Sequence, residues 1–185
     1  MKENVLFILV DCLRADKCYW SNRTCKSPNI DSLIEKGTFF SKVIATTTTT
    51  TPSVASLFTG LYTFAHGVRS LRGYRLANNV KTLAEIFKDN GYNTYAEVTG
   101  PLVDYTGLER GFNSYSYRNK KEYFVDEWGD DFINKINNGF FKQPWFIFIH
   151  LWELHEPRYI AKGFNNIKNG RNKYERALST LDAKL

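Results

Sequence analysis

The sequence lacks several features that would place a chain in a specialised class. No stretch of its 185 residues approaches 18 consecutive apolar residues, so we expect no membrane-spanning helix. The apolar run over 5–10 is too short for a secretory signal and no small-residue cleavage site follows it, which makes the cytoplasm the expected location. The sequence holds three cysteines, and their odd number without a signal peptide argues against a disulfide framework. The spacings between Cys12, Cys18 and Cys25 do not form the CxxC pairs of a zinc site. We therefore expect free thiols.

The composition is that of an ordinary globular chain, with 43% hydrophobic and 24% charged residues. Aromatic residues make up 16%, enough to build a sizeable core. The net charge is 25 − 19 = +6, and the basic residues are spread along the chain. A mild positive field suits a small anionic substrate as well as a polyanion, so nucleic-acid binding is kept as the third and weakest hypothesis, on the charge alone. We expect a small anionic substrate and no nucleic-acid partner.

Hydrophobic patterning predicts alternating strands and helices. Residues 4–10 and 144–152 are continuous apolar runs, which are typical of strands buried on both faces. Shorter strands are expected over 38–45 and 92–98, and a surface loop over 157–173. Capping residues and apolar stripes predict helices over 27–37, 52–59, 80–90, 121–138 and 172–185. This alternation indicates an α/β fold, a three-layer sandwich around a mostly parallel central sheet.

Three chemically suggestive groups follow expected strands, where ligands of open α/β sheets bind. Asp11 closes the first strand, a run of threonines follows the segment that ends near Ala45, and His155 follows the strand over 144–152. Taken one at a time, each has an ordinary structural explanation, because a carboxylate or threonine in such a place is usually a cap. A single histidine is more often a hydrogen-bonded scaffold residue than a catalytic group.

The start of the helix over 52–59 strengthens the chemical interpretation. Its unpaired N–H groups and positive dipole end point toward Thr50 and Thr51, which suits an anionic tetrahedral group. A hydroxyl held there is a plausible nucleophile if a divalent cation lowers its pKa. Asp11 could hold that cation, since hard metal ions prefer carboxylate oxygens.

Several segments together resemble the sulfatase family of the alkaline phosphatase superfamily. They occur in the family's order and cover nearly the whole chain. The matching segments are NVLFILVDCLRAD (4–16), SPNID (27–31), TTPSVASLFTGLY (50–62), HGV (66–68), KTLAEIFKDNGY (81–92), GF (111–112) and HLWELHEP (150–157).

The resemblance implies a role for each matching residue. Asp11 matches the family's first metal-binding aspartate, and Thr50 matches the nucleophile, which also touches the metal. His155 matches a histidine that contacts the anionic oxygens of the substrate and helps the leaving group. Thr51 and Ser53, at the start of the nucleophile helix, are expected to bind the substrate. The implied cofactor is a divalent ion: Ca, Mg, Mn or Zn. His66 and His150 are interpreted as structural, and Arg14 receives no chemical role.

The chain also departs from the family pattern. Sulfatases carry Cys or Ser as the nucleophile, oxidised to formylglycine, and an Arg two residues after the proline; this chain has Thr50 and Val54. Threonine cannot form that aldehyde, which makes phosphate or phosphonate esters competitors of sulfate esters. Cys12 replaces a second aspartate, and 99–101 replace an expected Lys–His pair.

The family's further metal ligands have no counterpart after His155. We therefore expect residues 1–185 to be the N-terminal portion of a single sulfatase-like catalytic domain, inactive alone and open to homo-oligomerisation through its unfinished sheet. The first hypothesis is a metal-dependent sulfate or phosphate ester hydrolase. The alternatives are a phosphoryl-group transferase, or a non-catalytic anion-binding fold that another chain could complete.

Overall fold

The structure is a computed structural model that describes residues 2–19 and 23–185. The chain divides into two compact units, which are described separately below. The first unit comprises Met1–Leu9, Ile44–Lys120 and Lys135–His150, and the second comprises Val10–Val43, Lys121–Asn134 and Leu151–Leu185. The expectation that all 185 residues form part of one domain stays a prediction.

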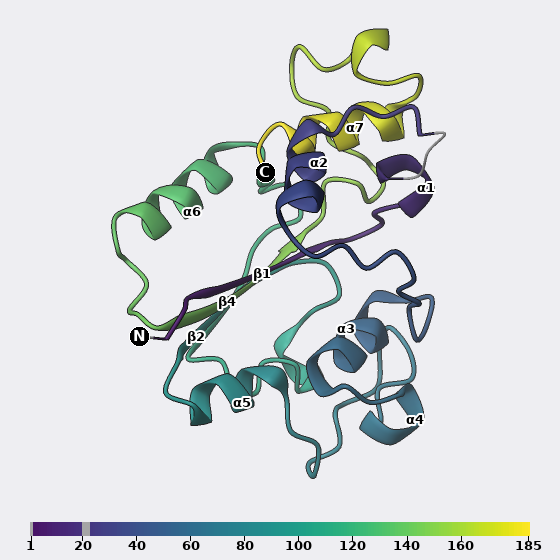
Figure 1. Cartoon of the computed structure of the whole chain (residues 1–185). Coiled ribbons are helices and arrows are strands. Elements are labelled where there is room, and N and C mark those ends of the chain that lie inside the picture. Colours follow the sequence, from purple (N-terminus) through teal and green to yellow (C-terminus); the bar gives the residue numbers. More distant parts are fainter. Residues whose placement is uncertain (1, 20–22) are drawn as a thin grey trace. The chain divides into compact units, whose positions relative to one another are not determined.

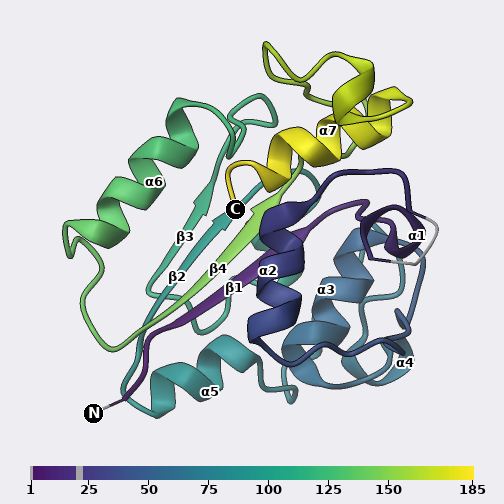
Figure 2. The same cartoon turned by 45° about the horizontal axis from the view of Figure 1, so that its top comes forward.

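The first unit holds most of a four-stranded sheet, drawn in Figure 2. Its strands lie in the order β1 (Val5–Val10), β4 (Trp145–Leu151), β2 (Asn93–Val98) and β3 (Ser114–Tyr117). β2 runs parallel to both of its neighbours, and its Asn93 lies opposite Trp145. The expected parallel sheet is therefore confirmed, with three of its strands close to the predicted ranges.

The helices of the first unit are α3 (Thr50–Thr59), α4 (Thr63–His66) and α5 (Leu83–Asp89), with a short 3-10 helix, η1, at Asp104–Thr106. α5 begins at a capping box, in which the Thr82 hydroxyl accepts a hydrogen bond from the Glu85 N–H and the Glu85 carboxylate accepts one from the Thr82 N–H. The helices predicted over 52–59 and 80–90 are thus confirmed, although α5 begins at Leu83.

Aromatic contacts fasten α3 and α5 to one face of β4. Phe58 of α3 packs edge-on against Phe148, with ring centroids 4.8 Å apart. Phe87 of α5 stacks on Phe146 at 4.3 Å. Phe146 and Phe148 are two residues apart and therefore share a face of the strand. These contacts position the N-terminus of α3 relative to the sheet.

The second unit contains α1 (Ala15–Cys18), α2 (Pro28–Lys36), α7 (Lys173–Asp182), the 3-10 helix η2 (Ile167–Asn169) and most of α6 (Glu127–Asn137). α2 and α7 lie side by side (Figure 1). The Asp182 carboxylate accepts hydrogen bonds from the N–H groups of Asn29 (3.1 Å) and Ile30 (2.8 Å), so it caps the first turn of α2.

A buried carboxylate joins α7 to the segment around α1. Burial raises the pKa of Glu175, but hydrogen bonds from Thr24, the Arg171 N–H and Lys17 outweigh it and hold the pKa at about 2. The ammonium of Lys17 lies 3.0 Å from the carboxylate. Glu175 is therefore a charged structural anchor.

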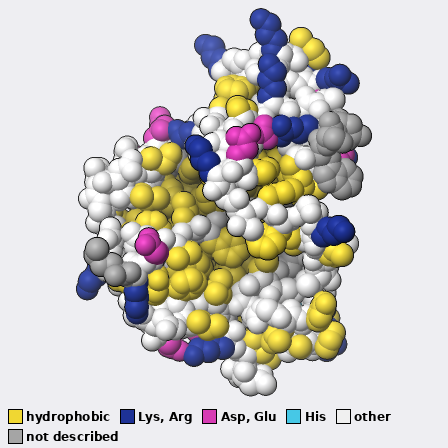
Figure 3. All heavy atoms as spheres, in the orientation of Figure 1, with side chains coloured by type: hydrophobic (Ala, Val, Ile, Leu, Met, Phe, Trp, Pro, Cys, Tyr) yellow, Lys and Arg dark blue, Asp and Glu magenta, His cyan; other side chains and the backbone are white. Residues whose placement is uncertain are grey.

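The strand predicted over 38–45 is wrong. The segment has no regular secondary structure and belongs to none of the four strands of the sheet. Phe40, Val43 and Ile44 are 71%, 78% and 90% exposed. Figure 3 shows that hydrophobic side chains reach the surface on one face of the molecule. A strand needs a neighbour for its backbone groups, and this segment has none in the described part of the chain.

Three further differences concern local structure. The helix predicted over 121–138 begins only at Glu127, the loop over 157–173 contains η2, and β3 was not predicted. Within residues 2–19 and 23–185, no helix combines the length and apolarity needed to cross a bilayer.

Candidate functional site

The second unit brings together two of the residues that the sequence singled out. Asp11 directly follows β1, and its N–H donates to the carbonyl oxygen of Leu151, 2.9 Å away. Ligand atoms of Asp11, Cys12 and His155 all lie within 4.8 Å of one another. Among the described residues, this is the one group of three or more His, Cys, Asp or Glu side chains that could hold a metal ion.

Cys12 joins this cluster although the sequence analysis treated it as a free thiol. It is indeed unpaired, as are Cys18 and Cys25. Its Sγ–H donates to Oδ1 of Asp11 at 2.9 Å. The pKa of Cys12 is raised to about 12, chiefly because burial removes hydration from the thiolate. The hydrogen bond to Asp11 and the negative charge of the Asp11 carboxylate raise it further. The signal that could have found it is its position directly after Asp11, the predicted metal ligand.

Tyr174 of α7 holds the backbone at Cys12. Cys12 has a φ of 60°, in the left-handed region that residues other than glycine rarely adopt. The Tyr174 hydroxyl donates to the Cys12 carbonyl oxygen at 2.8 Å and accepts from the N–H of Arg14 at 2.7 Å. These two bonds span the turn and stabilise its unusual conformation.

His155 is oriented by two contacts from its own loop. Its ring stacks on Trp152, with centroids 3.9 Å apart and planes 14° from parallel. Nδ1 lies 2.8 Å from the carbonyl oxygen of Glu156. A carbonyl oxygen can only accept, so Nδ1 carries the hydrogen and Nε2 of the neutral ring keeps its lone pair for a ligand.

Two guanidinium groups lie over the ring of Tyr174. Arg158 is 5.3 Å and Arg14 is 5.8 Å from the ring centroid. Each forms an ion pair with a nearby carboxylate, Arg158 with Glu156 and Arg14 with Asp16. The charge of Arg158 partly offsets the rise in the pKa of Cys12.

The threonine run lies in the first unit, where it leads into α3. Thr50 is the first residue of the helix, after the extended N-cap residue Thr49. The hydroxyl of Thr51, which is 1% exposed, donates to the carbonyl oxygen of Leu71 at 3.1 Å. The Ser53 hydroxyl donates to the carbonyl oxygen of Thr47 at 3.0 Å. These two side chains hold the loops around the start of the helix, and Thr50 is half-buried at its N-terminus.

His66 forms a closed network in the first unit. Nδ1 accepts a hydrogen bond from the N–H of Val68 (3.2 Å), so the ring hydrogen is on Nε2, which donates to the Ser56 hydroxyl at 3.0 Å. The hydroxyl of Thr46 also donates to Ser56. Burial lowers the pKa of His66. Because its Nε2 holds a proton, His66 cannot act as a base toward Ser56, which supports its structural interpretation.

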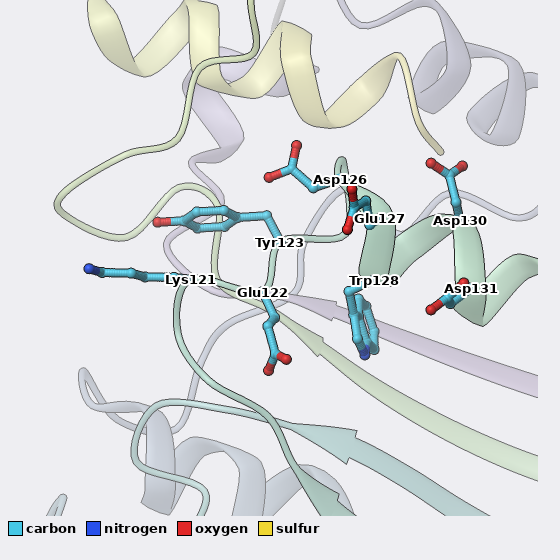
Figure 4. Close-up of a pocket in the computed structure, with 8 residues that line it drawn as sticks. All are labelled: Lys121, Glu122, Tyr123, Asp126, Glu127, Trp128, Asp130 and Asp131. Carbon is cyan, nitrogen blue, oxygen red and sulfur yellow. The ribbon is translucent and has the colours of Figure 1, made fainter.

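Apart from the cluster of Asp11, Cys12 and His155, a hollow of about 690 Å³ lies at the start of α6 (Figure 4). Five of its eight lining residues are acidic, and Figure 4 shows the Glu122 carboxylate pointing away from that of Asp126. Asp126 accepts a hydrogen bond from the Tyr159 hydroxyl at 2.6 Å. The carboxylates of Glu127 and Asp130 lie in the first turn of α6, where its dipole favours negative charge. The carboxylates do not converge as metal ligands would.

The structure is thus an α/β fold with a parallel sheet, and Asp11 directly follows its first strand. The chain belongs to the sulfatase family, whose family model matches residues 3–185. The resemblance seen in the sequence is therefore confirmed.

Individual comparisons agree with this assignment. Arylsulfatase D of Homo sapiens is 35% identical over 104 residues, which are 50% of this chain and 18% of the relative. The phosphonate monoester hydrolase of Agrobacterium radiobacter has the same fold, with a TM-score of 0.73, 21% identity, and coverage of 89% of this chain and 43% of that one. BT4656, solved in complex with its substrate D-glucosamine-2-N,6-O-disulfate, matches with a TM-score of 0.71 and 19% identity, over 87% of this chain and 36% of that one.

The chain thus spans less than half the length of these three proteins.

Proposed function

We propose that this chain carries part of the catalytic site of a metal-dependent hydrolase of sulfate or phosphate esters, with Thr50 as the nucleophile. Membership of the sulfatase family supports ester hydrolysis. The phosphonate monoester hydrolase fold neighbour and the sulfated-sugar complex of BT4656 support a substrate with a tetrahedral anionic group.

The observation that carries the proposal is the meeting of Asp11 and His155 in one cluster, since they come from distant parts of the sequence. The cluster fits a divalent ion, because an oxygen donor and a nitrogen lone pair lie close together. Asp11 would hold the ion and His155 would lie beside it, next to the anionic oxygens of the ester. The ion, when bound, would lower the pKa of the Thr50 hydroxyl.

Thr50 would supply the attacking oxygen. Its Oγ1 would lose its proton to solvent and bond to the sulfur or phosphorus of the ester. The bond to the alcohol oxygen of the substrate would break, and that oxygen would take a proton from solvent and leave as the alcohol; water would then hydrolyse the threonine ester. α3 begins at Thr50, and the positive end of its helix dipole would favour the oxygens of the anionic group there. Thr51 and Ser53 would keep that turn in place through their bonds to Leu71 and Thr47.

Thr50 also favours a second candidate, the phosphate or phosphonate ester. Threonine cannot be oxidised to the formylglycine aldehyde, so an unmodified hydroxyl must attack. The phosphonate monoester hydrolase neighbour supports this substrate class. A phosphoryl-group transferase, in which an alcohol replaces the final water, would use the same first step.

Substitution of Thr50 tests the proposal. Aryl sulfate, aryl phosphate and aryl phosphonate are offered to the full-length protein with Mg²⁺, Ca²⁺, Mn²⁺ or Zn²⁺. We expect Thr50→Ala to lower kcat/KM by about 1,000-fold or more, because the covalent step is lost, while Thr50→Ser keeps part of the activity. Thr48→Ala, a neighbouring exposed threonine, is the matched control. Equal turnover by Thr50→Ala and the wild type would refute the nucleophile, and a preferred ester would identify the substrate class.

A further inference from the structure

Three donor atoms of three different kinds converge in the second unit. They are a carboxylate oxygen of Asp11, the sulfur of Cys12 and a ring nitrogen of His155, all within 4.8 Å of one another. Metal–ligand distances of about 2.0–2.3 Å place the donors of a tetrahedral ion about 3.3–3.8 Å apart. The sulfur is already 2.9 Å from Oδ1 of Asp11, so small side-chain adjustments would let the three donor atoms coordinate one ion.

We propose that Asp11, Cys12 and His155 form a three-ligand site for a thiophilic divalent ion of the zinc class. This inference rests on the metal-binding role of Asp11 in the proposed function, but not on the chemistry of Thr50. The sulfur decides the class of metal, because Ca²⁺ and Mg²⁺ take oxygen ligands whereas Zn²⁺ takes thiolate, imidazole and carboxylate together. Three protein ligands leave a fourth position open, as in catalytic zinc sites.

The surroundings of His155 fit this assignment. Metal-binding histidines commonly donate their other N–H to a carbonyl or carboxylate, which fixes the tautomer and the ring orientation. His155 does so from Nδ1 to the Glu156 carbonyl oxygen, and its stacking on Trp152 limits rotation of the ring. Nε2 is therefore the nitrogen presented to an ion. If His155 binds the ion, its interaction with the ester would be indirect, through an ion that both of them coordinate.

The surroundings of Cys12 fit as well. Tyr174 bonds to the Cys12 carbonyl oxygen and to the Arg14 N–H, which holds the backbone that follows the cysteine and preorganises the sulfur beside Asp11. The thiol hydrogen now lies between Sγ and Oδ1. When an ion binds, the S–H bond breaks, the sulfur–metal bond forms and the proton goes to solvent, with no change of oxidation state. The nearby charge of Arg158 is balanced by Glu156.

Calorimetry and cobalt spectroscopy on the 185-residue chain test the proposal. We expect one Zn²⁺ per chain, bound at least about 100-fold more tightly than Ca²⁺ or Mg²⁺, because these ions gain little from sulfur. Co²⁺, used as a spectroscopic substitute for Zn²⁺, should produce a thiolate-to-cobalt charge-transfer absorption. Absence of this absorption in the wild-type chain, or Ca²⁺ binding as tight as Zn²⁺ binding, would overturn the proposal.

Variants identify the ligands. Loss of an outer contact to a metal site weakens affinity by about 10–100-fold, so loss of a ligand in Cys12→Ser or His155→Ala should weaken Zn²⁺ binding by about 100-fold or more. Cys12→Ser should also abolish the cobalt absorption, and Cys12→Asp should shift the preference toward Mg²⁺. Cys25→Ser, another free thiol of the same unit, is the control and should change neither property. Unchanged Zn²⁺ affinity in Cys12→Ser or in His155→Ala would refute the three-ligand set.

The two proposals fail separately. Zinc binding with the cobalt absorption, together with full activity of Thr50→Ala, would refute the nucleophile and leave the metal site. Loss of activity in Thr50→Ala without thiolate–metal absorption would refute the metal site and leave Thr50 as the nucleophile.

Discussion

Two histidines of this chain lie in different surroundings, His66 in the packed core of the first unit and His155 in the candidate metal cluster of the second. His66 is fully buried in the first unit, and both of its ring nitrogens have partners, Ser56 and the Val68 N–H. His155 lies partly exposed in the second unit, with its Nδ1 bound to a carbonyl oxygen and its ring on Trp152.

The difference lies in the tautomer that the neighbours impose on each imidazole ring. The Val68 N–H forces the ring hydrogen of His66 onto Nε2, where the Ser56 hydroxyl accepts it. The Glu156 carbonyl forces the ring hydrogen of His155 onto Nδ1, so that Nε2 can accept an ion. A serine beside a histidine is therefore not sufficient for a nucleophile and its base.

The largest expected effect comes from exchanging these two histidines for alanine. His66→Ala should lower the free energy of unfolding by about 3 kcal/mol, because it leaves a cavity and unpaired polar groups in the core. His155→Ala should lower it by about 1 kcal/mol or less, through lost stacking on Trp152. Urea titration followed by circular dichroism measures both.

Zinc affinity should show the opposite order, since only His155 belongs to the metal cluster. Folded His66→Ala should bind Zn²⁺ as the wild type does. Equal losses of stability in the two variants would contradict the division between a packing and a chemical histidine.

A smaller effect is expected from Tyr174, which links packing and chemistry within the second unit. Tyr174→Phe removes the hydroxyl that bonds to the Cys12 carbonyl and the Arg14 N–H. We expect a loss of about 1–2 kcal/mol in unfolding free energy, because two backbone groups lose their partner. Zinc affinity should fall several-fold, since Cys12 loses its fixed backbone. Tyr62→Phe, an exposed tyrosine of the first unit, is the control; if both variants bind Zn²⁺ alike, Tyr174 does not position the site.

Much of the fold could be predicted because burial leaves a direct pattern in the sequence. β4 is buried at every residue, and its apolar run is the pattern expected of a strand buried on both faces. β3, by contrast, has the sequence SYSY, and only its pairing with β2 makes it a strand. The segment 38–45 has a strand-like sequence without a partner. Strand formation thus depends on neighbours that no local pattern contains.

The candidate site was predictable only in part. Asp11 and His155 were found because they follow strands and match motifs of the sulfatase family. Cys12 was not predicted to join them, because the spacing of the three cysteines forms no CxxC pair, whereas its neighbours in the cluster are an aspartate and a distant histidine. Residues that act together through the fold, such as Tyr174 with Cys12, leave no local spacing to detect.

The smallest expected effect is a pH dependence that belongs to His66. Burial lowers its pKa below the ordinary 6.5, so the unfolded chain binds a proton that the folded chain does not. Stability from this group is therefore complete above pH 6.5 and falls as the pH drops toward the folded pKa, with a slope of at most about 1.4 kcal/mol per pH unit. Urea titrations between pH 7.5 and 5 should show this slope in the wild type and a flatter one in His66→Gln. The same slope in the wild type and in His66→Gln would mean that His66 is also protonated in the folded chain. The contrast with His155 would then no longer rest on an uncharged, buried His66.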